Sequence, residues 1–317
     1  MKSFHKSFRT PSFLALAVAA ALAGCAATQD AGHSAMNMVK SATGQAQVVR
    51  QDVAPALYQV AYSPSENVVY AVSAGNPKDP ASGVKSKLFK LDPETLAVKA
   101  EIELPKPGYG LTLDDEAHRL YIVDTRGGTL MVYDTTLGQV TSSVTMPPVL
   151  DAQGKPEKIE YREIVVDKAN NRLYLPAMSY HDSKLQVVNL DTLTVERTIP
   201  GFNFGATGIS MDSGAGKLYV SNLMGQLFVV DIGTLAITDR FEVQGDQLLN
   251  LVVDHDNKRL LAVDQGFDRL DVVRKERGGL NYQTRTQGNQ VLALDPSSGK
   301  VLQNIKVGTQ PVAMLLD

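Results

Sequence analysis

One pattern of residues occurs five times along this chain, at intervals of roughly 40–50 residues. Each copy reads as an apolar strand, a polar turn, a second strand that often contains Leu-Tyr, a loop, a third apolar strand that leads to an Asp turn, and a fourth strand. The first halves begin at Val60, Leu111, Ile164, Ile209 and Leu251, and the second halves at Leu88, Leu130, Leu185, Leu227 and Val291. A period of this length with four short strands is typical of one blade of a propeller. The expected fold is therefore all-β, a β-propeller of four-stranded blades.

Aspartate and tyrosine recur at fixed positions within the copies. A short carboxylate accepts N–H groups of its own turn, so we interpret the recurring turn aspartates as structural rather than catalytic or calcium-binding. Those before the fourth strand are Asp92, Asp134, Asp191, Asp231 and Asp295. The tyrosines of the second strand are predicted to pack between blades, and they are Tyr70, Tyr121, Tyr174 and Tyr219.

The first 25 residues have the pattern of an export signal. A basic start is followed by an apolar run at residues 12–23, which is too short to span a bilayer comfortably. The run ends in Leu-Ala-Gly-Cys at residues 22–25, which resembles the lipobox of bacterial lipoproteins. We predict a lipoprotein signal peptide over residues 1–25 with lipidation at Cys25. An ordinary signal peptide cut near the same place is the alternative.

The residues after this signal bear on where the protein resides. Residues 26–46 are small and polar without a period, which predicts a flexible tether. By resemblance to sorted lipoproteins, Ala26 and Ala27 favour the outer membrane. We therefore expect a protein of the cell envelope that faces the periplasm, with the membrane as a partner through its lipid anchor. The net charge of −3 gives no electrostatic reason to expect nucleic acid as the main partner.

The repeats resemble the YVTN-type β-propeller family, and the layout of the chain resembles the YncE-like periplasmic members of that family. The resemblance is carried by Asn-Arg-Leu-Tyr-Leu from Asn171, by Gly-Lys-Leu-Tyr-Val-Ser-Asn from Gly216, and by the aspartate turns given above. It covers roughly residues 45–317. These motifs imply a fold much more strongly than a function.

The family usually has seven blades, whereas five complete repeats are counted here. Residues 47–53 are predicted to form a lone outermost strand, and residues 308–317 a lone innermost strand. A propeller closes when strands from both ends of the chain complete one blade, and here the middle strands of that blade are missing. We therefore predict a propeller domain over residues 47–317 that is incomplete at the C-terminus.

The strand order gathers two sets of loops at one face, around the mouth of the central channel. The expected ligand-binding residues there are Tyr109, Asp124, Arg126, Arg162, Glu163, Tyr180, His181, Asp182, Asn222, Asn250, Asp264 and Arg269. Among them, Tyr180-His181-Asp182 is the strongest single candidate, because it joins an imidazole to a carboxylate. A polar rim with aromatic side chains suits a protein, a peptide, a glycan or a small polar ligand.

Motifs of catalysis are missing from the sequence. There is no nucleophile elbow and no phosphate loop, and the histidines have no spacing that would support a zinc site. We predict no catalytic residue, no metal and no cofactor, and a non-catalytic binding or scaffold role. A propeller enzyme or cofactor-binding subunit, such as a lactonase-like hydrolase, is the alternative.

The longest departure from the repeat is the loop at residues 265–290. Its Arg274, Lys275, Arg277 and Tyr282 are predicted to contact a partner, because a long loop on a rigid scaffold is usually functional or disordered. Basic side chains beside an aromatic ring also suit single-stranded nucleic acid. Nucleic-acid binding through this loop is a second alternative function.

Overall fold

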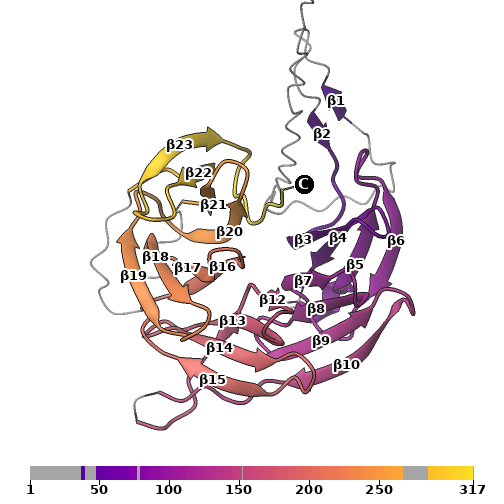
Figure 1. Cartoon of the computed structure of the whole chain (residues 1–317). Coiled ribbons are helices and arrows are strands. Elements are labelled where there is room, and N and C mark those ends of the chain that lie inside the picture. The colour runs from indigo at the N-terminus through magenta and orange to yellow at the C-terminus, as the bar shows by residue number, and fades with distance from the viewer. Residues whose placement is uncertain (1–36, 40–47, 77–78, 152, 267–284, 317) are drawn as a thin grey trace, which may run out of the picture.

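The computed structural model describes residues 37–39, 48–76, 79–151, 153–266 and 285–316 (Figure 1). These residues form strands throughout, apart from one short 3-10 helix, η1 (Pro80–Ser82). Five antiparallel blades follow one another around a central axis, and no strand pairing joins one blade to the next among the described residues. The prediction of an all-β propeller with five four-stranded repeats is confirmed. No helix in this part of the chain reaches the length and hydropathy that a membrane-spanning segment needs.

The first two blades are regular. Blade 1 contains β3 (Leu57–Ser63), β4 (Val68–Ser73), β5 (Lys87–Leu91) and β6 (Val98–Glu103). Blade 2 contains β7 (Gly110–Asp114), β8 (Arg119–Val123), β9 (Thr129–Asp134) and β10 (Gln139–Thr145). In both blades each strand pairs with its neighbour in the chain, so the first strand lies innermost and the fourth outermost.

The other three blades follow the same order. Blade 3 contains β11 (Glu160–Tyr161), β12 (Val165–Asp167), β13 (Arg172–Met178), β14 (Lys184–Asn189) and β15 (Val195–Ile199). Blade 4 contains β16 (Ala206–Asp212), β17 (Lys217–Asn222), β18 (Gln226–Asp231) and β19 (Ile237–Glu242). Blade 5 contains β20 (Leu248–Asp254), β21 (Arg259–Asp264), β22 (Gln290–Leu294) and β23 (Val301–Lys306).

The tyrosine of the second strand packs against the following blade, as the repeat predicts. Tyr70, Tyr121, Tyr174 and Tyr219 are at most 3% exposed, and each belongs to an apolar cluster that includes residues of the next blade. Tyr174, for example, packs with Ile209 and Leu218 of blade 4. Burial of large side chains between sheets therefore holds neighbouring blades together.

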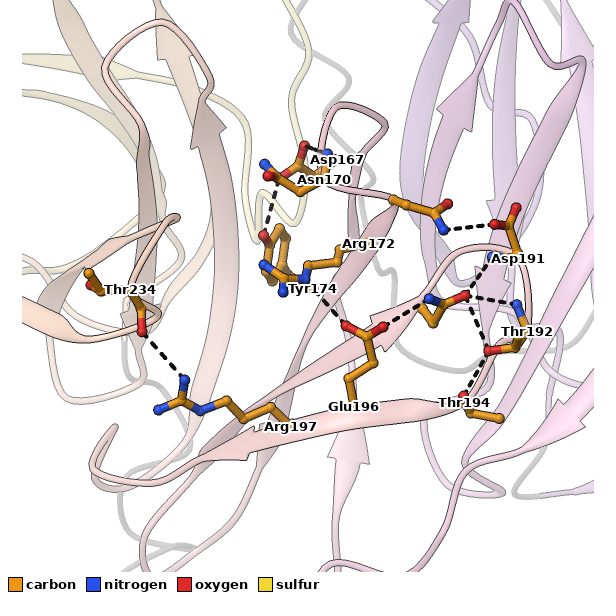
Figure 2. A network of polar contacts seen from close by, with 12 residues as sticks. Asp167, Asn170, Arg172, Tyr174, Asp191, Thr192, Thr194, Glu196, Arg197 and Thr234 are labelled. Carbon is orange, nitrogen blue, oxygen red and sulfur yellow. Dashed lines mark hydrogen bonds and ion pairs between the residues drawn. The ribbon is translucent and has the colours of Figure 1, made fainter.

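The recurring acids cap their own turns, with one change from the prediction. In the turn before the fourth strand, one side-chain oxygen of Asp92, Asp134, Asp231 or Asp295 accepts N–H groups two or three residues further on. In blade 3 this position belongs to Asn189, whose Oδ1 accepts the N–H groups of Asp191 and Thr192 (Figure 2). Assigning the role to Asp191 was wrong by two residues, because an amide oxygen accepts the same bonds as a carboxylate.

The two ends of the propeller domain differ from expectation. In the range predicted as a lone strand, β2 (Val48–Arg50) pairs with β1 (Asn37–Val39), which falls within the predicted tether. Residues 308–316 form no strand, although a lone innermost strand was predicted there. These residues pass between blade 5 and blade 1, where Met314 and Leu316 pack on blade 5 and Leu315 packs on blade 1. They have no neighbouring strand of their own blade among the described residues, so no ladder forms.

A bulge recurs near the start of the innermost strands. The pairing register shifts by one residue between Leu57 and Val60 in β3, and at the equivalent places in β16 and β20. In blade 3 the strand breaks there, which separates β11 from β12. The break lies beside Pro176 of β13, which has no N–H to donate to an inner neighbour. A bulge changes the direction of the side chains beside it, so these positions are where the repeats can present polar groups outside the ladder.

Candidate functional site

Three polar side chains occupy equivalent bulge positions in the repeats. Gln59 of blade 1, Glu163 of blade 3 and Asn250 of blade 5 each precede the first residue of the repeated strand pattern by one position. All three are buried, at 8%, 1% and 1% exposure. They lie where the innermost strands start, at the mouth of the channel, and their partners differ sharply.

Glu163 and Asn250 meet across the channel. The Asn250 side-chain amide donates to both carboxyl oxygens of Glu163, at 3.1 and 3.2 Å, and Asn250 Oδ1 accepts the N–H of Met314 at 3.0 Å. The N–H of Ile209 in blade 4 also donates to Glu163. Burial raises the pKa of Glu163 well above its ordinary value, and the Asn250 and Ile209 bonds offset only part of that effect. This group therefore joins blades 3, 4 and 5 to the C-terminal segment.

The other side of the mouth is built by Tyr58, Tyr109 and Arg162, from blades 1, 2 and 3. The two tyrosine rings meet edge to face, with centroids 5.3 Å apart. Arg162 Nη2 donates to Glu160 at 2.8 Å. Burial disfavours the charge on Arg162, but Tyr58 and Glu160 outweigh it and raise the pKa of the guanidinium. Arg162 therefore stays cationic.

Polar atoms on this side lack partners. Gln59 Oε1, Arg162 Nε and Thr125 Oγ1 are buried without a hydrogen bond to any described residue, whereas the buried Tyr58 hydroxyl has the Arg162 side chain as its hydrogen-bonding neighbour. Burial also raises the pKa of the Tyr58 hydroxyl, which stays protonated near neutral pH. Leaving a buried donor or acceptor unpaired costs about 1–3 kcal/mol, so such atoms at a channel mouth mark a place for a bound group. Tyr58, Gln59, Tyr109 and Arg162 are called the mouth site below.

Gly110 allows blade 2 to approach this site closely. A Cβ atom on Gly110 would lie 2.8 Å from the carbonyl oxygen of Arg162. Only a residue without a side chain fits this approach of β7 to the bulged strand of blade 3. The close contact holds Tyr109, the residue before it, beside Tyr58.

Three of the predicted rim residues cap loops instead. Asn222 and Asp264 end the second strands of their blades and Asp124 directly follows one, and a side-chain oxygen of each accepts the N–H two residues further on. Asp264 also accepts from Thr286 and Gln290, both at 2.8 Å, while burial raises the pKa of Asp264. The recurrence of this position in several repeats is the sequence signal of a structural role.

The structure separates the roles within Tyr180-His181-Asp182. Both oxygens of Asp182 accept backbone N–H groups, those of Gly201 and Asn203, each at 3.0 Å. Tyr180 packs edge to face on Phe204, with centroids 5.5 Å apart. His181 is exposed and lines a small pocket of about 200 Å³ with Glu157 and Lys158. The Asp182 carboxylate is thus used to hold a turn, and it does not orient the imidazole.

Of the remaining predicted residues, one lies near the mouth and the others lie outside the described residues. Arg126 is exposed, and its charge lies near Tyr109. Arg269, the partner-loop residues Arg274, Lys275, Arg277 and Tyr282, and the lipidation site Cys25 lie outside the described residues. Within the described residues, no group of three acidic, histidine or cysteine side chains is arranged to hold a metal.

Sequence reasoning brought Tyr109, Arg162, Glu163 and Asn250 to one place, and the structure does the same. It missed Tyr58 and Gln59, because the first repeat was read only from Val60 onward. Aligning the two residues before each first strand would have found them, since Tyr58-Gln59 then matches Arg162-Glu163.

Comparisons with known proteins agree with the fold. No family model matches the chain. The uncharacterized protein YncE of Salmonella typhi is 24% identical over 296 residues, which cover 85% of this chain and 82% of that protein. YncE of Escherichia coli K12 is 25% identical over 241 residues, which cover 74% of this chain and 66% of that protein.

A solved structure supports the same architecture. A chain in the crystal structure of a nidogen/laminin complex superposes with a TM-score of 0.56 at 15% identity. The match covers 81% of this chain and 84% of that chain, and it shows the fold alone. This chain is therefore a β-propeller that is similar to YncE proteins over most of its length.

Proposed function

We propose that this chain is a non-catalytic binding protein of the bacterial cell envelope, which holds its ligand or partner at the mouth site. The observation that carries the proposal is a pair of buried polar atoms, Gln59 Oε1 and Arg162 Nε, that have no hydrogen-bond partner among the described residues. Three different blades contribute to this site, so the scaffold fixes its geometry before a ligand arrives. A preformed site loses little ordering free energy on binding.

The partners of the acidic groups support binding rather than catalysis. Glu163 is joined to Asn250 and Ile209, and Asp182 and Asp264 hold loops. A general base needs a lone pair directed at a substrate proton, and these carboxyl groups already accept bonds from the protein. The positive charge of Arg162 is balanced by its ion pair with Glu160. The hydrogen-bonding atoms that remain for a ligand are the unpaired ones of the mouth site, Gln59 Oε1 and Arg162 Nε.

The direct test is a ligand screen by thermal shift on the purified protein and on Arg162→Gln. A ligand of the mouth site stabilises the wild-type protein and loses at least tenfold in affinity in the variant, because it loses a charged donor. Arg197→Gln is the matched control, since Arg197 is exposed and bonds only to the Thr234 carbonyl of blade 4 among the contacts seen (Figure 2). A ligand that binds Arg162→Gln as well as wild type would place function elsewhere.

The location is a separate part of the proposal. The basic start, the short apolar run and Leu-Ala-Gly-Cys at residues 22–25 support lipid attachment at Cys25 and anchoring in the outer membrane, with the propeller in the periplasm. The test is expression in bacteria with a labelled fatty acid, followed by membrane fractionation. Wild type should carry label and sediment with outer membranes, and Cys25→Ser should do neither. Unlabelled wild-type protein would refute the anchor.

A further inference from the structure

The hydrogen-bonding groups of the mouth site limit the chemistry of its ligand. Arg162 Nε can only donate, and Gln59 Oε1 can only accept. A ligand that satisfies both must carry an acceptor and a donor. A carboxylate would leave Gln59 Oε1 unpaired, and an ammonium group would leave Arg162 Nε unpaired and be repelled by the guanidinium.

The charges at the site are already balanced. Arg162 forms an ion pair with Glu160 at 2.8 Å, and the Glu160 side chain is 9% exposed. Burial favours the uncharged form of the neighbouring Glu163, which also accepts from the amide of Asn250. A charged ligand would therefore have to be desolvated without gaining an unpaired counter-charge, which opposes its binding. An uncharged polar group avoids that penalty.

Gln59 and Arg162 come from different blades, so a ligand that pairs with both needs its donor and its acceptor at separate places. Gln59 comes from blade 1 and Arg162 from blade 3, with Tyr109 of blade 2 between them in the ring. In a peptide unit the C=O and the N–H point in opposite directions from one rigid plane. The tyrosine pair supplies an aromatic surface for the apolar atoms next to that plane.

We propose that the mouth site binds an uncharged segment of peptide backbone, whose carbonyl oxygen accepts from Arg162 and Tyr58 and whose N–H donates to Gln59. This inference rests on the proposed function, since it specifies the ligand class of the same site. Recognition of the backbone would leave the identity of the ligand side chains to the surrounding loops, as in other extended-peptide sites.

The experiment uses capped peptides and a matched ester. Acetylated and amidated tripeptides with uncharged side chains are titrated into the full-length protein by calorimetry. The best of them is then compared with its depsipeptide analogues, in which one N–H is replaced by oxygen. One analogue should bind about tenfold more weakly, because Gln59 Oε1 is left without a donor.

The variant Gln59→Met decides whether that N–H reaches Gln59. In this variant the peptide and the depsipeptide should bind equally, because no acceptor remains to tell them apart. Gln153→Met, at an exposed position, should keep the tenfold difference. A difference that persists in Gln59→Met would overturn the inference, even if the peptide binds.

The outcomes also separate this inference from the proposed function. If an oligosaccharide or a carboxylate binds with dependence on Arg162 and no peptide does, the mouth site is a binding site and the peptide assignment is wrong. If no peptide, oligosaccharide or carboxylate binds in an Arg162-dependent way, both proposals fail. Circular dichroism of each variant confirms that a loss of binding is not a loss of fold.

Discussion

The turns of the blades and the mouth of the channel are both polar, but they satisfy their polar groups differently. In the turns, Asp92, Asp134, Asn189, Asp231 and Asp295 bond to N–H groups of their own turn. At the mouth, Glu163 and Asn250 find partners on other blades, and Gln59 Oε1 finds none among the described residues. A polar residue repeated in every blade thus serves the blade, whereas one that differs between blades serves the ring or a ligand.

The largest expected effect concerns a repeated residue that packs between blades. Tyr174→Ala removes a fully buried ring and its bond to Asp167, and should lower the free energy of unfolding by about 3–5 kcal/mol. Tyr174→Phe keeps the ring and should cost about 1 kcal/mol. Urea denaturation measures both. Equal losses in the two variants would mean that the hydroxyl, and not inter-blade packing, is what the repeat preserves.

The next prediction tests the bond across the channel. Glu163→Ala leaves the buried amide of Asn250 without its acceptor and should cost about 1–3 kcal/mol of unfolding free energy. Glu163→Gln resembles the protonated acid in shape and should cost less. Urea denaturation at pH 7 distinguishes them. If both variants are as stable as wild type, Glu163 does not hold the ring, and the contrast with the turns is lost.

The pH dependence of stability sharpens the same contrast. Because burial raises the pKa of Glu163, the folded state holds this proton more tightly than the unfolded chain does. Its contribution is therefore fully present below the ordinary glutamate pKa and is lost as pH rises through the raised value, at no more than about 1.4 kcal/mol per pH unit. Denaturation curves across this range should show the decline in wild type and a smaller one in Glu163→Gln. Parallel profiles would contradict the raised pKa.

The smallest effect concerns the turn of blade 3, where sequence and structure disagreed. Asn189→Ala removes an acceptor for two N–H groups and should cost about 1 kcal/mol. Asn189→Asp restores the acceptor found in the other four blades but replaces the Nδ2 donor to Glu196 by a second carboxylate, so it should recover only part of that loss. Asp191→Ala should cost less than Asn189→Ala, although Asp191 accepts a bond from Asn171. Thermal melts of the three variants measure these losses. A larger loss of stability in Asp191→Ala than in Asn189→Ala would mean that Asp191 caps the turn.

The fold could be predicted because its determinants are local and repeated. Apolar alternation, turn acids and the second-strand tyrosine each report on a few neighbouring residues, and five copies confirm one another. The mouth site was predictable only in part. Topology brought Arg162, Glu163 and Asn250 together, but the bond between Glu163 and Asn250 joins residues 87 positions apart, and no local pattern encodes it.

The errors have a physical cause as well. Asp124, Asn222 and Asp264 were expected to face a ligand because they lie on the correct loops. Whether a loop acid faces solvent or its own backbone depends on the turn that the loop adopts. The two-residue spacing to the N–H that each accepts would have indicated the second outcome.

The separation of the blades has a consequence for how such chains change over evolutionary time. Each described blade is a complete hydrogen-bonded sheet, and its contacts with the next blade are made mainly by side chains, with a few backbone bonds between loops such as that from Tyr161 N–H to the Thr125 carbonyl. Duplication or deletion of a whole repeat would therefore break no backbone ladder. It would change the contacts at two blade faces and the diameter of the ring. The number of blades can then change during evolution. The polar residues at the channel mouth depend on the diameter of the ring, so they must adapt after each gain or loss of a blade.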